Sequence, residues 1–169
     1  MRGKLQQTYR AAQELERQSA FGGSIPLGEM PRLASLLMSD EGSVEVEFEF
    51  TRGNYQHDAI RGRYRAGLTT QCQRCLDPMT LAVEQSFELL IDASDEDVEA
   101  FQVDTVYTDD GHLNVFEVIE DELILALPLI MMHENVDCNR YLSKPVHDDA
   151  PAEERPNPFA VLASLKEPN

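Results

Sequence analysis

The sequence of 169 residues lacks several features that would place it in other classes of protein. Its longest apolar stretch, 123–132, is interrupted by proline and is far shorter than the ~20 residues that a membrane span requires. The N-terminal residues lead into Gln, Glu and Arg instead of an apolar segment, so we expect no secretory signal. Three cysteines are an odd number, which argues against a disulfide framework and favours a cytoplasmic location.

Basic residues are also missing from a long central stretch. Between residues 76 and 139 the chain has no Lys or Arg but 17 Asp and Glu, whereas the remaining residues carry 14 acidic and 14 basic side chains. The whole net charge of −17 therefore comes from this stretch. Such a surface repels phosphate backbones and favours a basic protein partner, although acidity can also serve solubility alone.

Alternating apolar and polar residues predict an antiparallel sheet. Residues 44–50 place Val and Phe on one side and Glu on the other, which indicates a strand with one buried face. The same period of two runs through 59–70 and again through 79–91. We predict that these two segments form a long β-hairpin with Cys72-Gln73-Arg74-Cys75 at its tip. A short edge strand is expected within 103–107.

Helices are predicted on both sides of this hairpin in the sequence. Residues 8–20 are rich in helix formers, and 30–38 carry apolar residues at helical spacing. Asn114 can cap a helix over 115–127, while 92–100 are expected to form an acidic loop. Together these patterns predict an α+β fold, with an antiparallel sheet built on the long hairpin and helices on one face.

The C-terminal part of the sequence is predicted to be a flexible tail after a single domain of residues 1–142. Residues 143–156 have the composition of a mobile linker. Residues 157–169 contain a short helix motif that is marginal alone in water, with Asn157 and Pro158 at its start. Its apolar face must therefore rest on the domain or on another protein. That face, the candidate partner-binding surface, comprises Phe159, Leu162 and Leu165.

The spacing of cysteine and histidine predicts one metal site. Cys72 and Cys75 form a CxxC pair, and Cys138 follows His133 by five positions. Two such pairs can complete a Cys3His tetrahedron around zinc. The alternative is a set of reduced, partly buried thiols beside an ordinary surface histidine. A redox CxxC is disfavoured, because a thioredoxin-like site opens a helix, whereas Pro78 and a strand follow here.

Two further groups of charged residues admit a functional interpretation. One is the arginine stripe, which comprises Arg61, Arg63, Arg65 and Arg74. The stripe could contact RNA phosphates, but no aromatic residues with RNA-motif spacing accompany it, and pairing with Glu84 and Glu88 across the hairpin is preferred. The other group, residues 120–122, cannot converge on one magnesium ion, because consecutive helix positions point in different directions; we expect a charged outer helix face.

Four segments of the sequence, in their order and spacing, resemble a known family. They are Cys72-Gln73-Arg74-Cys75-Leu76, 120–128, 133–138 and 156–166. Together they resemble the bacterial YceD family, whose members are described as needed for accumulation of 23S ribosomal RNA. The resemblance implies a cytoplasmic ribosome-biogenesis factor without catalytic activity. Genes of the family commonly neighbour that of a small, basic, zinc-binding large-subunit ribosomal protein, which suggests a partner. Some relatives carry a further CxxC pair, which this chain lacks.

These observations lead to one main hypothesis about function. The chain is expected to be a non-enzymatic factor that supports accumulation or processing of 23S rRNA by binding a basic ribosomal or rRNA-processing protein. The alternatives are a module that binds rRNA directly through the arginine stripe, and a small zinc-binding regulatory protein. A metal-dependent hydrolase would require converging ligands that the sequence does not supply.

Overall fold

The computed structural model describes residues 3–52 and 57–139. Contacts within the chain divide it into two units, Met1–Cys138 and Asn139–Asn169, and all the described helices and strands belong to the first. The predicted linker and tail helix fall outside the described residues. The same holds for the candidate partner-binding residues Asn157, Pro158, Phe159, Leu162 and Leu165.

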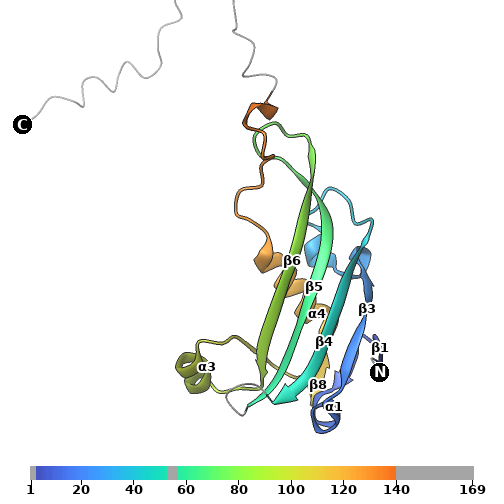
Figure 1. The fold of residues 1–169 in the computed structure, drawn as a ribbon, viewed down its shortest axis with the longest axis vertical. Helices are drawn as coiled ribbons and strands as arrows, with labels where there is room; N and C mark the ends of the chain where they lie inside the picture. The colour runs from blue at the N-terminus through green and yellow to red at the C-terminus, as the bar shows by residue number, and fades with distance from the viewer. Residues whose placement is uncertain (1–2, 53–56, 140–169) are drawn as a thin grey trace, which may run out of the picture. The chain divides into compact units, whose positions relative to one another are not determined.

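Six strands form the main sheet, in the order β1-β3-β4-β5-β6-β7 (Figure 1). Its members are β1 (Gly3–Lys4), β3 (Ala20–Pro26), β4 (Ser43–Arg52), β5 (Asp58–Gln71), β6 (Pro78–Ile91) and β7 (Thr105–Val106). The four central strands are antiparallel, and only the short edge strands β1 and β7 pair in parallel. A second, two-stranded sheet pairs β2 (Thr8–Arg10) with β8 (His112–Asn114).

The predicted hairpin of β5 and β6 is confirmed. Each strand has 14 residues, and their register is continuous from Ala59 opposite Leu90 to Gln71 opposite Pro78. Because side chains alternate between the two faces of a strand, one face of the hairpin is apolar and packs on the core. The CxxC motif lies in the turn between the strands. The alternation of apolar and polar residues therefore predicted this part of the sheet correctly, and the predicted α+β class is also confirmed.

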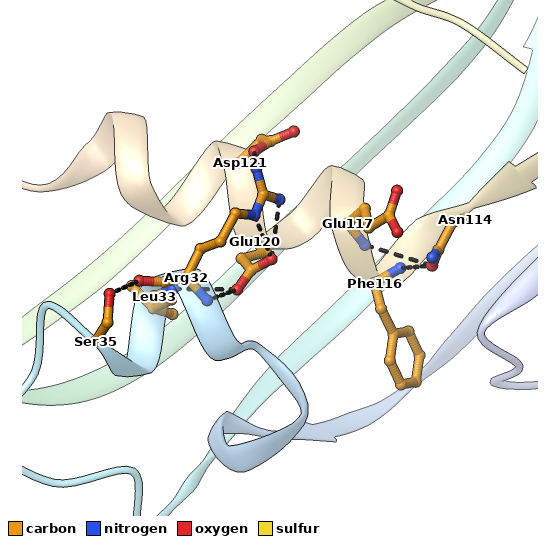
Figure 2. Close-up of polar contacts among 8 residues, drawn as sticks. All are labelled: Arg32, Leu33, Ser35, Asn114, Phe116, Glu117, Glu120 and Asp121. Atoms are coloured by element: carbon orange, nitrogen blue, oxygen red, sulfur yellow. Dashed lines mark hydrogen bonds and ion pairs between the residues drawn. The ribbon is translucent and has the colours of Figure 1, made fainter.

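Helix α4 (Val115–Ala126) covers the apolar face of the sheet (Figure 1). Asn114 caps it as predicted, because the side-chain oxygen accepts hydrogen bonds from the N–H groups of Phe116 and Glu117 (Figure 2). The Tyr64 hydroxyl donates to the Glu122 carbonyl at 3.0 Å and joins β5 to the helix. Among the described residues no helix is long and apolar enough to span a membrane.

The N-terminal region differs from its prediction as a helix over 8–20. It forms β2, α1 (Ala11–Arg17) and β3, with a short 3-10 turn η1 (Leu27–Glu29) after β3. The reason is tertiary, because Tyr9 packs its ring against the aromatic rings of Phe21, Phe48 and Phe50. Strand β3 meanwhile pairs with β4 along its whole length. The intrinsic helix propensity of these residues contributes less free energy than such burial and strand pairing.

Two other local predictions are also wrong. The helix predicted over 30–38 is only α2 (Pro31–Ala34), because the chain then turns so that the Met38 N–H donates to the Thr69 carbonyl of β5. The acidic loop predicted over 92–100 contains α3 (Asp95–Phe101), which is capped by the Ser94 side chain. Acidic residues in its first turn are favourable there. The expected edge strand within 103–107 is confirmed as β7.

Glu120 does not lie on an outer charged face, as the sequence suggested. Its side chain is 4% exposed and reaches from α4 to the start of α2 (Figure 2). Its Oε1 accepts from the N–H groups of Arg32 at 2.7 Å and Leu33 at 3.1 Å. The Arg32 guanidinium also binds Glu120 Oε2 at 2.9 Å and Asp121 at 2.6 Å. Helix α2 has no side-chain cap of its own, so a carboxylate from another helix satisfies its first N–H groups.

Candidate metal centre

The tip of the hairpin holds the first pair of candidate ligands. Cys72 directly follows β5 and is fully buried. Its N–H donates to the Asp77 carbonyl at 3.0 Å, and its carbonyl accepts from the Leu76 N–H at 2.8 Å. These two bonds close the turn, in which Leu76 adopts a positive φ of 64°. The turn therefore returns the chain into β6 with both cysteines held on a fixed backbone.

The second pair of candidate ligands arrives from the segment after α4. The Gln73 N–H donates to the Met131 carbonyl at 2.8 Å, which attaches this segment to the hairpin tip. The short 3-10 turn η2 (Val136–Cys138) follows and presents Cys138. Figure 1 shows η2 beside the hairpin tip, at the end of the sheet remote from α3. The long hairpin and the end of α4 thus bring the two half-sites to one place.

The four predicted ligand atoms meet in space. One atom from each of Cys72, Cys75, His133 and Cys138 lies within 4.8 Å of all the others. The sulfurs of Cys72 and Cys138 are 3.9 Å apart, and the sulfur of Cys75 is 3.3 Å from His133 Nδ1. Bonds of ~2.3 Å to sulfur and ~2.0 Å to nitrogen around a tetrahedral zinc ion place ligand atoms about 3.5–3.8 Å apart. The described geometry therefore suits a tetrahedral Cys3His metal site.

Arg74, which the sequence suggested as part of a possible RNA-binding stripe, belongs to this cluster. Its Nε donates to the Cys138 sulfur at 3.1 Å. Its Nη2 donates to the carbonyls of His133 and Asn135, both at 2.7 Å. Three thiolates around a divalent metal ion would carry a formal charge of −1, which the guanidinium cation would offset. The side chain also ties the CxxC turn to the segment that brings the other two ligands.

The pKa values of Cys72 and Cys75 are shifted in opposite directions. Burial by itself would raise the pKa of Cys72, but three backbone N–H groups donate to its sulfur and lower that pKa overall. They belong to Cys75, His133 and Arg74. Burial raises the pKa of Cys75, and its hydrogen bonds with the neighbouring thiols raise it further. Such N–H donors to sulfur are also suited to a thiolate that ligates a metal.

The other members of the arginine stripe lie on the solvent-facing side of the sheet. Arg61 opposes Glu88 and Arg65 opposes Glu84 across the hairpin, as the sequence suggested. The direct ion pairs, however, are made with β4, which the sequence did not identify as the neighbour. They join Arg61 to Glu49 at 2.6 Å, Arg63 to Glu47 at 2.7 Å and Arg65 to Glu45 at 2.6 Å.

The carboxylates on α4 do not form a second metal site. Glu120 and Asp121 bind Arg32, and Glu122, which is half-buried, is not part of any group of potential ligands that meet. Burial, together with Asp104 and Asp121, raises the pKa of Glu122. Within residues 3–52 and 57–139, the Cys3His cluster is the one group of three or more potential ligands that could hold a metal ion.

Comparison with known proteins places the chain in a family. The family described as "Large ribosomal RNA subunit accumulation protein YceD" matches residues 60–166, which include the hairpin, α4 and the Cys3His cluster. The chain belongs to the YceD family. A curated YceD relative from Haemophilus influenzae carries the same description and is 29% identical over 170 residues, covering 97% of each chain. No solved structure matches the chain. The resemblance noted in the sequence is thereby confirmed.

Proposed function

We propose that this YceD-family chain is a non-enzymatic factor that supports the accumulation of 23S rRNA in the large ribosomal subunit. The observation that carries the proposal is the family match over residues 60–166, together with a relative matched over almost its whole length. The names of the family and of the relative describe accumulation of the large ribosomal RNA and no catalysed reaction. The cluster at the hairpin tip, which suits a closed four-ligand site, also favours a structural role.

The proposed partner is a basic large-subunit ribosomal protein or rRNA-processing factor. The charge distribution supports this choice, because residues 76–139 carry 17 acidic and no basic side chains. An acidic surface attracts a basic protein over a distance of about 10 Å in dilute salt. The same acidic surface repels the phosphate groups of RNA. Direct rRNA binding through the arginine stripe is less favoured, because Arg61, Arg63 and Arg65 already pair with glutamates of β4.

Loss of the protein is expected to lower the ratio of 23S to 16S rRNA in growing cells. A factor that supports the large subunit acts on 23S rRNA without a matching effect on 16S rRNA. The measurement is quantitative electrophoresis of total RNA before and after depletion, with re-expression of the wild-type chain as the control. A ratio that stays constant after depletion would argue strongly against the proposed function.

The metal of the proposed site is zinc, in the role of a clamp between the hairpin tip and the segment that follows α4. Tetrahedral coordination by three cysteines and one histidine is typical of structural zinc. Bound zinc would stabilise a part of the protein that has little apolar packing, since Leu76, Leu129 and Val136 are exposed. The ion would thus hold in place a region that the hydrophobic core does not fix.

Native mass spectrometry of the purified chain is expected to find about one zinc ion per chain, in keeping with four ligands that form one site. Cys72→Ser and His133→Ala should each abolish binding of stoichiometric zinc, because three ligands remain. His112→Ala is the matched control, since this histidine lies on β8 outside the cluster, and it should retain zinc. Zinc-free protein that also fails to take up added zinc under reducing conditions would contradict the proposal.

A further inference from the structure

Within residues 3–52 and 57–139, one long edge of the main sheet has no strand paired with it. Strand β6 pairs with β5 along its entire length, but on its other side it pairs with β7 only at Leu90 and Ile91. Residues 78–88 of β6 therefore form an edge, which we call the β6 edge. No described residue is hydrogen-bonded to the backbone on that side of these positions. An edge of this length presents a row of free donors and acceptors to another strand.

The direction of each backbone group along the β6 edge follows from the bonds at its end. The N–H groups of Leu90 and Asp92 point away from β5, because they donate to the carbonyls of Asp104 and Val106, both at 2.9 Å. The register with β5 is continuous, so the same direction recurs at every second residue towards the tip. The residues whose N–H and C=O groups face outward are Thr80, Ala82, Glu84, Ser86 and Glu88.

The β6 edge lacks some of the features that commonly protect an edge strand. Natural edges are blocked by lysine, by proline or by a β-bulge. The β6 edge has no lysine or arginine, its register shows no bulge, and its one proline is the first residue, Pro78. Its outward positions instead carry the carboxylates of Glu84 and Glu88. A strand that adds beside them would meet acidic side chains together with free backbone groups.

We infer that the β6 edge binds an extended, basic segment of a partner protein, which adds to the sheet as a further strand. The inference rests on the proposed function, since it names the surface that its basic protein partner would use. Backbone hydrogen bonds would supply affinity, as in other cases of strand addition. Glu84 and Glu88 would select basic side chains on the added strand, because opposite charges on neighbouring strands are favourable.

A second copy of this chain fits the β6 edge less well. Two β6 strands that paired around a two-fold axis at Ser86 would place Glu84 of each copy directly opposite Glu88 of the other. Like charges directly opposite one another destabilise an antiparallel pair. The charge on the edge thus favours a basic partner over self-association.

Amide hydrogen exchange, measured by NMR on the full-length chain, tests the inference residue by residue. In the free chain, amides of the five outward residues should exchange at least tenfold faster than those of Leu81, Val83, Gln85 and Phe87, which face β5. The probes are the basic proteins of the large ribosomal subunit and the basic rRNA-processing proteins, purified and added one at a time. Binding of one of them should slow the outward amides at least tenfold and leave the inward amides unchanged.

Several results would overturn the inference. Slow exchange of the outward amides in the free chain would show that a second copy or another segment already covers the edge. Binding of a ribosomal protein that protects amides elsewhere, and not these five, would place the partner on a different surface. Absence of binding by every probe would overturn both the inference and the proposed partner class, whereas an altered rRNA ratio on depletion would still stand.

Substitutions at Ser86 provide a second test with a matched control. Ser86→Pro removes one outward N–H and leaves the ladder with β5 intact, a position that proline tolerates in an edge strand. It should weaken binding of the probe at least tenfold, whereas Ser86→Ala, which keeps the N–H, should bind as the wild type does. If Ser86→Pro fails to fold, Glu84→Lys serves instead and should weaken the same complex. Equal affinities of all these variants and the wild type would refute strand addition at this edge.

Discussion

Gly62→Ala is expected to destabilise the protein by about 3 kcal/mol or more, the upper range for inserting atoms into a packed core. Gly62 lies in β5 opposite Phe48 of β4. A Cβ at this position would overlap the carbonyl oxygen of Glu47 and lie 2.8 Å from the Cβ of Phe48. These neighbours belong to the backbone and to the root of a buried side chain, so they cannot move aside without separating the two central strands.

The matched control for Gly62→Ala is Gly67→Ala in the same strand. A Cβ at Gly67 meets no heavy atom within 4 Å. Alanine there should be neutral or stabilise by about 0.4–1 kcal/mol, because it reduces the conformational freedom of the unfolded chain. Urea unfolding followed by circular dichroism measures both effects. Similar unfolding midpoints for the two variants would contradict the close packing of β4 on β5.

Glu120→Ala is expected to lower the free energy of unfolding by about 2–4 kcal/mol, because a buried donor left without an acceptor costs roughly 1–3 kcal/mol. The substitution removes the acceptor for two N–H groups at the start of α2, those of Arg32 and Leu33. It also removes the ion pair between Glu120 and Arg32. The Arg32 side chain is 53% exposed and remains paired with Asp121, so water and that carboxylate limit the loss.

Two further substitutions separate the capping role of Glu120 from its charge. Glu120→Gln keeps an oxygen that can accept from the α2 backbone, so it should be milder than Glu120→Ala. Asp121→Ala is the control, because its ion pair with Arg32 is exposed on both sides and should be worth less than ~1 kcal/mol. Chemical denaturation of the three variants provides the comparison. If Asp121→Ala lowered the free energy of unfolding as much as Glu120→Ala does, the buried cap would contribute no more than the exposed ion pair.

The features that the sequence predicted correctly depend on neighbours along the chain. The alternation through 59–70 and 79–91 defines the hairpin, since each strand needs one apolar face. Asn114 caps α4 because its side chain reaches N–H groups two and three residues ahead. The Cys3His cluster could be predicted because the chain has only three cysteines, and the hairpin turn and the end of α4 leave few ways to pair them.

The features that the sequence did not reveal depend on partners far along the chain. Strand β3 forms in a segment without a clear period of two, because β4 offers it a pairing partner and Phe21 packs against the ring of Tyr9. Helix α3 forms in an acidic segment, where Val98 packs against Ala59 and Leu90 on the other face of the sheet. The Ser94 cap of α3 is a local feature that could have indicated this helix, but no pattern of nearby residues reveals the pairing of β3 or the packing of Val98.

The sequence by itself determined the class of fold, the long hairpin, the four candidate ligands and the family of this protein. Those properties could be predicted from local periodicity, from the spacing of rare residues and from motifs. Only the tertiary structure decided that Glu120 caps another helix, that Arg74 contacts the cysteine cluster, and that no strand among residues 3–52 and 57–139 pairs with the outer side of β6 before Leu90. Each of these depends on which backbone and side-chain groups meet after folding, because the partners that satisfy buried polar groups can lie far along the chain.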